Sequence, residues 1–569
     1  MDQKIGMEIY WIMRKSTLLN LNDMKKLGFF FITSLSLTLS VDAQIYTHQD
    51  SLRGGITKER AWWDLQQYSL FFDVNPTTKS ISGSNAIRYK VIKAHQILQL
   101  DLQAPMAILS VTQDGIPLVI KDEGNAHFVE LIKKQVVGAQ EELVVLFSGK
   151  PLVAKNPPWD GGFTWKKDVN NNPFIATSCQ EIGASLWWPC KDHMYDEPDQ
   201  GMLITVTVPK GLVAVSNGRL KEENQKNATS STYVWEVKNP INNYGVNINI
   251  GNYVHFSEVY AGEKGPLDMD YWVLKENLEK AKIQFKDAKR MMEAFEYWFG
   301  PYPFYEDSYK LVEVPYLGME HQSSITYGNK FSNGYLGSDL SGTGWGKKFD
   351  YIIIHESGHE WFANNITAKD NADLYIHESF TTYSEALFVE YFYGKPAGFE
   401  YVRGLRYGIE NNSPLIGDYD VNDPSNSDIY SKGSNVLHTL RQLVGEDDKW
   451  REILRGLNKQ FYHQTVSSQD IESYIATSSG LRLDAFFDQY LRDARMPVFQ
   501  YKIEGKNQKK LSFRWSECID GFDMRLKIKY NDKVMYVYPT TKWSSIALDK
   551  KCEKIIISKE YYVGQEKIN

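Results

Sequence analysis

The chain has 569 residues, a net charge of −7 and a sequence pI near 6.0. This length predicts about three or four domains. The acidic balance provides no basic field for nucleic acid, and the sequence contains no phosphate loop and no dinucleotide fingerprint, so a nucleic-acid-binding protein and a nucleotide-dependent enzyme are set aside.

The amino-terminal extension, residues 1–43, predicts export. From Met24 the chain reads MKKLGFFFITSLSLTLSVDAQ, with two lysines, a short apolar run and small residues that end at Ala43. This order fits a secretory signal peptide cleaved after Ala43, and it predicts a periplasmic or secreted protein without a stable membrane span after cleavage. Met1 and Met24 both stay open as the start residue. An uncleaved anchor is the alternative if the residues before Met24 are made.

The predicted elements change character along the chain. Short alternating runs separated by Gly, Asn and Pro predict a β domain over residues 44–256. Apolar residues at three- and four-residue steps predict an amphipathic helix over residues 276–299, within a helix-rich stretch at 257–496. Alternation on both sides of Asn531-Asp532 predicts a hairpin in a small β-sandwich at 497–569. The expected fold class is multi-domain α+β.

A metal-binding pattern lies in the helix-rich stretch. His355 and His359 are four residues apart, and Glu378 follows after a gap of 18 residues. On a helix the two imidazoles project from one face, one turn apart. Glu378 is then the third ligand, which leaves one position open for water, as in catalytic zinc sites. Glu356 lies beside that face and is the candidate base that accepts a proton from water.

This pattern and three other motifs resemble peptidase family M1, the gluzincin aminopeptidases that include alanyl aminopeptidases and leukotriene hydrolases. Upstream, LGMEHQSSITYG resembles the family's Gly-x-Met-Glu-Asn exopeptidase motif, with Met319 and Glu320 in register. Two positions depart from it, because Leu317 replaces the first Gly and His321 replaces the Asn. These two changes affect the expected backbone contacts to the substrate more than the expected role of Glu320.

Two further segments resemble the family. YSKGSNVLHTLRQLVG resembles the segment with the family's transition-state tyrosine, and SCQEIGASLWWPCKDHMYDEPD resembles the segment whose Gln or Glu helps to hold the substrate amine. The resemblance covers roughly residues 50–500. It implies catalytic roles for Glu356 and Tyr430, and it implies metal ligands and substrate-binding residues as follows: His355, His359 and Glu378 for the metal, and Glu320, Gln180, Met319 and Gly318 for the substrate.

The resemblance also implies an architecture and a reaction. The expected parts are a saddle-like N-terminal β domain, a thermolysin-like catalytic domain and a small C-terminal β-sandwich, without the large helical domain of many members, so that the cleft is more open. The expected function is a zinc-dependent aminopeptidase, with one zinc ion per chain, that acts on peptides with a free N-terminus; cobalt or manganese stays open as the metal. The alternatives are a zinc endopeptidase, a non-catalytic peptide-binding protein and a leukotriene-hydrolase-like epoxide activity.

The sequence contains four cysteines, and none shows the close paired spacing of a zinc knuckle. In an oxidising compartment Cys518 and Cys552 could bridge two strands of the last domain. Cys179 and Cys190 are at least as well explained as buried free thiols.

Overall fold

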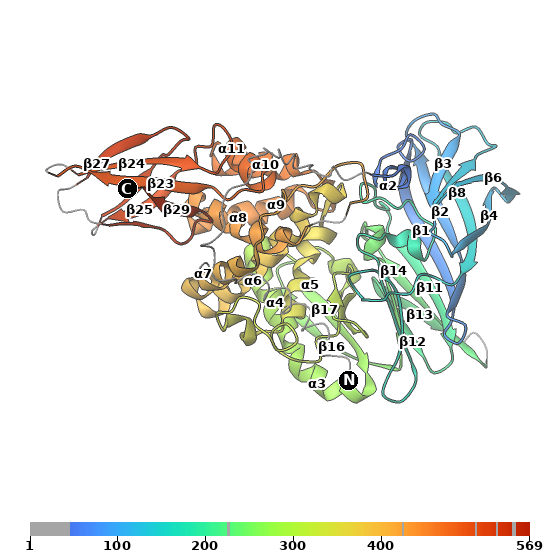
Figure 1. Ribbon diagram of the computed structural model, residues 1–569. Coiled ribbons are helices and arrows are strands. Elements are labelled where there is room, and N and C mark those ends of the chain that lie inside the picture. The colour runs from blue at the N-terminus through green and yellow to red at the C-terminus, as the bar shows by residue number, and fades with distance from the viewer. Residues whose placement is uncertain are drawn as a thin grey trace, which may run out of the picture. The chain divides into compact units, whose positions relative to one another are not determined.

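The computed structural model of the chain describes residues 46–224, 228–423, 426–506, 509–530, 533–548 and 554–568 (Figure 1). The predicted signal peptide lies outside these residues, as do Cys552 and the predicted turn Asn531-Asp532. In the described ranges, no helix is both long enough and apolar enough to span a bilayer.

The N-terminal part of the described chain is built from β-sheets. Its largest sheet has eight strands within the described residues, and neighbouring strands are antiparallel except β1 and β11, which pair in parallel. Buried and more exposed residues alternate along strands such as β14, as expected for a sheet with one face on a core. In order across the sheet, the strands are β13 (Arg219–Asn224), β14 (Ser230–Val237), β11 (Met202–Pro209), β1 (Trp63–Asn75), β2 (Ser80–Val91), β8 (Gln140–Gly149), β4 (Ala107–Gln113) and β5 (Ile116–Pro117).

Two smaller sheets complete this part, and one of them positions a predicted substrate-binding residue. β10 ends at Ser178, so that Gln180 follows directly after a buried strand. The side chains of the large sheet and of β10 belong to one hydrophobic core. The smaller sheets contain β12 (Val213–Ser216), β15 (Ile248–Gly251), β10 (Pro173–Ser178) and β9 (Gly162–Lys167), and separately β3 (Ile97–Asp101), β7 (Ala126–Glu130) and β6 (Val119–Glu123).

A five-stranded sheet of described residues carries the predicted exopeptidase motif. β16 crosses the position between residues 256 and 257, where the sequence placed a domain boundary, and pairs with β17 along its whole length. β19 lies at one edge of the sheet and has β20 as its neighbour, so one side of its backbone is free to pair with an extended peptide. The order is β16 (Tyr253–Gly262), β17 (Gly265–Leu274), β18 (Tyr309–Glu313), β20 (Ile325–Tyr327) and β19 (Gly318–Met319).

Two α-helices, α3 and α4, lie between β17 and β18 in the chain, and the others follow β20, apart from α2 near the start of the described residues. One short parallel pair of strands, β21 (Ile366–Ala368) and β22 (Gln464–Val466), lies among them. The helices are α2 (His48–Gly54), α3 (Leu278–Gln284), α4 (Lys286–Phe299), α5 (Tyr351–Gly358), α6 (Tyr375–Tyr393), α7 (Lys395–Gly404), α8 (Asp428–Val444), α9 (Asp447–Gln460), α10 (Ser468–Ser479) and α11 (Asp484–Leu491).

The helix predicted over residues 276–299 is interrupted. α3 and α4 meet at Phe285, whose backbone leaves the helical conformation. The Phe285 ring is buried among the rings of Phe256, Tyr271 and Tyr327, with centroids between 5.0 and 6.4 Å away. Packing of this ring thus overrides a continuous helical pattern, while Gly300 ends α4 as predicted.

Contact between α6 and α8 links two parts of the predicted site. The Ser379 hydroxyl donates to the Ile429 carbonyl at 2.7 Å, next to Glu378 in one helix and Tyr430 in the other. A Cβ on Gly433 would lie 1.8 Å from Ser379 Oγ, so only glycine permits this approach.

The last described residues form two sheets that share a hydrophobic core with the helices. β25 and β26 pair as the predicted hairpin requires. Cys179 and Cys190 are buried free cysteines, whereas the Cys518–Cys552 pairing stays a prediction. The sheets contain β27 (Ser544–Leu548), β24 (Lys509–Ser516), β23 (Val498–Glu504) and β29 (Gly564–Lys567), and β26 (Lys533–Val537), β25 (Leu526–Tyr530) and β28 (Ile555–Ile557).

We expect Gly433→Ala to destabilise the protein by about 1–3 kcal/mol, because the added methyl group must push α8 away from Ser379. Urea unfolding measures the change. Gly408→Ala is the matched control, since a Cβ there meets its nearest neighbour at 3.8 Å. Equal stability of the two variants would contradict the close α6–α8 contact.

Candidate metal centre

The helix α5 presents the first two predicted ligands. Asp350 caps its start by accepting from the backbone N–H groups of Ile352 and Ile353, and the three isoleucines that follow Tyr351 are buried. This apolar anchor holds His355 and Glu356 in the interior, where each is less than a tenth exposed. α5 ends at Gly358, with His359 as its C-cap.

The third predicted ligand, Glu378, lies in the first turn of α6 and is buried. Its Oε2 is 3.7 Å from His355 Nε2 and 3.4 Å from His359 Nε2. This oxygen accepts no hydrogen bond of normal geometry from the described residues. Ligands at about 2.1 Å from one tetrahedral ion lie about 3.4 Å apart, so the three side chains fit a zinc ion.

Each imidazole is oriented through its other nitrogen. His355 Nδ1 lies 2.7 Å from Glu385 Oε1, and His359 Nδ1 lies 3.1 Å from the Phe362 carbonyl. Because both oxygens only accept hydrogen bonds, Nδ1 carries the proton in each ring and Nε2 is left to bind a metal. The Tyr401 hydroxyl donates to Glu385 Oε2 at 2.6 Å and fixes that carboxylate.

The local backbone explains the partner of His359. After α5 the chain makes a π-type turn over Glu360–Asn364, in which Phe362 and Ala363 leave helical geometry. This turn places the Phe362 carbonyl next to the His359 ring, and π-type turns are frequent at functional sites. Sequence reasoning missed this carbonyl, which has no side-chain signal. Glu385 also was missed, although it lies two helical turns after Glu378 on the same face.

A neighbouring histidine, His377, is not part of the ligand group. Its Nε2 accepts from the Ala368 N–H at 2.7 Å, which ties the start of α6 to β21. Burial lowers its pKa to about 3, so the ring is neutral.

Glu356 lies between the ligand group and the edge strand β19. A Cβ on Gly318 would lie 3.3 Å from Glu356 Cγ and 2.5 Å from Ile352 Cγ2, so a larger residue would displace α5. Glu320, Glu356 and His359 each have a ligand atom within 4.8 Å of the others. Burial raises the pKa of the Glu356 carboxyl to about 7.

Glu320 and Gln180 reach the same place from two different elements. The Asn364 side chain donates to the Glu320 carbonyl at 2.9 Å and fixes the turn after β19. Glu320 Oε1 has no hydrogen-bond partner of normal geometry among the described residues. Gln180 Nε2 donates to Glu378 Oε1 at 3.3 Å, so the loop after β10 touches the ligand group directly.

Tyr430, in the first turn of α8, faces the ligand group. Its ring lies 6.1 Å from the His355 ring in a stacked arrangement, and 37% of the residue is exposed. Burial of the hydroxyl, together with the charges of Glu378 and Glu320, raises the pKa of the phenol well above its usual value. The hydroxyl therefore keeps its proton at neutral pH and can donate.

The two departures from the exopeptidase motif are accommodated without breaking the strand. The Leu317 carbonyl accepts from the Gly328 N–H at 2.7 Å, and Met319 remains paired with Thr326. His321 is fully buried in the turn between β19 and β20, and burial lowers its pKa to about 3. A neutral imidazole thus stands where the family has an amide.

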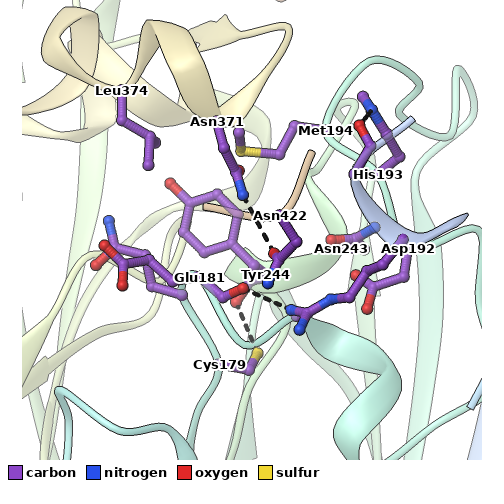
Figure 2. Close-up of a pocket in the computed structure, with 14 residues that line it drawn as sticks. Cys179, Glu181, Asp192, His193, Met194, Asn243, Tyr244, Asn371, Leu374 and Asn422 are labelled. Atoms are coloured by element: carbon purple, nitrogen blue, oxygen red, sulfur yellow. Dashed lines mark hydrogen bonds between the residues drawn. The ribbon is translucent and has the colours of Figure 1, made fainter. Parts of the chain in front are cut away.

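A small cavity borders the ligand group on the side of Gln180. It has a volume of about 50 Å³, enough for a few water-sized groups, and its lining includes both polar and apolar side chains. Figure 2 shows Tyr244 near its centre, with Asn371 and Leu374 on one side and Asp192 and His193 on the other.

Comparison with known families agrees with this geometry. A model described as the peptidase family M1 domain matches residues 283–490, and one described as the peptidase M1 N-terminal domain matches residues 65–244. Together the two matches cover more than half of the chain, which belongs to peptidase family M1.

Individual relatives are distant. The tricorn protease-interacting factor F2 of Thermoplasma volcanium is 27% identical over 351 residues, which are 58% of this chain and 42% of that protein. The probable aminopeptidase 1 of Sulfurisphaera tokodaii is 23% identical over 522 residues, 86% of this chain and 60% of that protein. The chain spans about half the length of these curated relatives.

Solved structures show the same fold. A mutant M1 zinc metallopeptidase from Deinococcus radiodurans, bound to a Tyr-Ser-Ala substrate, superposes with a TM-score of 0.63 at 20% identity. The match covers 74% of this chain and 92% of that one. A similar structure with bound L-tryptophan is described as a two-domain M1 zinc metallopeptidase.

We expect Glu385→Gln to weaken zinc binding about 10- to 100-fold, because the charge that orients and polarises His355 is lost. Competition with a chromogenic chelator measures the dissociation constant. Glu446→Gln removes an exposed carboxylate of the same type and is the control. Unchanged zinc affinity in Glu385→Gln would contradict the orienting role.

Proposed function

We propose that the protein is a zinc-dependent aminopeptidase that removes residues one at a time from the free amino terminus of peptides. The observation that carries this proposal is the unpaired Glu378 Oε2, with the Nε2 atoms of His355 and His359 at 3.7 and 3.4 Å. The relatives described as aminopeptidases support it.

His355, His359 and Glu378 would hold the metal, since their donor set of two imidazoles and one carboxylate is that of catalytic zinc sites. A zinc ion bound there acts as a Lewis acid on the peptide carbonyl and lowers the pKa of a bound water. Glu378 is suited to this role because, although burial pushes its pKa up, the His359 and His355 imidazoles hold it below its usual range.

Glu356 is the proposed base. It is buried beside His355 and packed against Gly318 of β19, on which the substrate backbone would lie. Its carboxylate takes a proton from water as the oxygen adds to the carbonyl carbon, and it returns the proton to the leaving nitrogen as the C–N bond breaks. The Tyr430 hydroxyl donates to the carbonyl oxygen, on which negative charge develops.

Glu320 and Gln180 are the proposed amine-binding residues. Glu320 Oε1 is buried and unpaired among the described residues, and a carboxylate there is well matched to an ammonium group. Gln180 uses its Nε2 on Glu378, which leaves its Oε1 to accept from the substrate. An acylated amine would lack the charge that these acceptors require.

Export is a separate proposal. Its support is the order of lysines, apolar run and small residues between Met24 and Ala43, which is typical of a cleaved signal peptide.

The proposal is tested with one peptide in amino-free and amino-acetylated forms, with products read by mass spectrometry. We expect stepwise trimming of the free form only, abolished by a chelator and restored by zinc. Internal cleavage of both forms would instead establish an endopeptidase, and no cleavage of either would favour a peptide-binding protein.

We expect Glu356→Gln to lower turnover by about 100- to 10,000-fold, because a general base is lost. Zinc content should stay near one ion per chain, since Glu356 is not assigned as a ligand. Metal analysis and single-turnover kinetics check both statements, and loss of zinc would show that Glu356 is a ligand.

We expect Glu320→Gln to lower kcat/KM for the amino-free peptide by about 10- to 100-fold, the effect of losing one charge-assisted hydrogen bond. Any slow hydrolysis of the acetylated peptide should change much less. Glu410→Gln, which removes an exposed carboxylate on another loop, is the control. Equal losses on both peptides would remove the amine-binding role.

A further inference from the structure

A second, larger groove lies beside the edge strand β19. It has a volume of about 530 Å³ and draws its lining from several separate segments of the chain. Its walls include Trp159, Lys280, Tyr316, Leu317, Lys330 and Leu336.

Two walls of the groove connect it to the metal centre. Tyr316 and Leu317 come directly before Gly318, the residue that packs on Glu356. On the other wall, Leu336 follows Tyr335, whose ring lies 5.4 Å from that of Tyr351. Tyr351 in turn stacks on His355 at 5.1 Å. The groove therefore continues the site beyond Glu356.

The position along β19 decides which part of a peptide reaches the groove. Glu320, proposed to hold the amine, and Leu317, on the groove wall, flank the two residues of β19. They are three residues apart, at most about 10 Å if this stretch is fully extended. A peptide that lies along β19 with its amine at Glu320 would bring its second or third residue to the groove.

The lining favours an apolar side chain. Trp159 is 59% exposed and Leu336 46% exposed, and Phe331 also lines the groove. Leu336 and Phe331 both have positive φ angles, 49° and 56°, which are unusual for residues of this kind. The chain thus holds two large apolar side chains in a loop where glycine would be less strained.

Charge adds a second preference. Lys280 and Lys330 both line the groove. The Glu313 carboxylate, which also lines it, is buried and already accepts from the Leu274 N–H at 2.8 Å and from Asn277 at 2.7 Å. Lys280 also donates to the Asn277 side chain at 3.3 Å, which leaves its positive charge in place. Burial raises the pKa of the Glu313 carboxyl to about 7, so this one carboxylate offsets at most one of the two lysines. The remaining positive charge attracts an anion, and the carboxyl terminus of a short peptide is the anion that would arrive with the substrate.

We propose that this groove binds the part of the substrate downstream of the cleaved bond, where it selects an apolar side chain and the free carboxyl terminus of a short peptide. The proposal rests on the aminopeptidase function. It makes short peptides with an apolar second or third residue the preferred substrate class.

The test measures binding to zinc-loaded Glu356→Gln protein and kcat/KM with the wild type. The ligands are Ala-Ala-Leu, Ala-Leu-Ala, Ala-Ala-Gly and the amide of Ala-Ala-Leu. We expect at least one leucine peptide to bind about tenfold more tightly than Ala-Ala-Gly, and the amide to bind about fivefold less tightly than the free acid.

Matched variants test which groove residues cause the leucine preference and which cause the carboxylate preference. Trp159→Ala should reduce the leucine preference to about threefold or less, and the double variant Lys280→Gln with Lys330→Gln should abolish the carboxylate preference. Trp543→Ala and Lys210→Gln, which alter other exposed residues of the same types, should preserve both. Equal binding of the leucine and glycine peptides, or variants that behave like their controls, would overturn the proposal.

The outcome is separable from that of the proposed function. Hydrolysis of alanine p-nitroanilide, which has no downstream residue, reports on the aminopeptidase alone. Loss of that reaction would contradict the aminopeptidase, while the binding measurements would still decide whether the groove discriminates.

Discussion

The structure depends on one costly arrangement, the burial of the Glu378 carboxylate against two imidazoles. A carboxylate oxygen without a hydrogen bond is expensive in the interior, and Glu378 Oε2 accepts none of normal geometry from the described residues. The fold tolerates this unfavourable free energy because the His355 and His359 nitrogens face the Glu378 oxygen. Together the three atoms form the ligand set of a cation. A bound metal ion would stabilise the fold as well as the site.

The surrounding elements maintain this arrangement from several directions. Glu385 and the Phe362 carbonyl hold the outer nitrogens of the two rings, and Gly433 allows α8 to approach α6. The buried Glu360 carboxylate accepts from the Ser323 N–H and from the Asn364 side chain. These bonds join the turn after β19 to the π-type turn that follows α5. The proposed substrate-binding and metal-binding residues are therefore parts of one connected network, in which a shift of one element would move the others.

Much of this site could be predicted from the sequence, because its ligands follow helical periodicity. The four-residue spacing of His355 and His359 needs only the pitch of an α-helix, and Glu385 could have been found from its seven-residue distance to Glu378. The Phe362 carbonyl could not, since it depends on a π-type turn. The break at Phe285 likewise arises from rings contributed by distant strands. The groove beside β19 joins segments far apart in the sequence, so no local pattern indicates it.

Zinc K-edge X-ray absorption of the purified protein tests directly whether His355, His359 and Glu378 hold one zinc ion. We predict one zinc per chain with two imidazole nitrogens and a carboxylate oxygen, all at about 2.0–2.2 Å, and a His359→Ala variant that loses one nitrogen from this shell. A purified protein that binds no zinc, or a zinc shell that His359→Ala leaves unchanged, would contradict it.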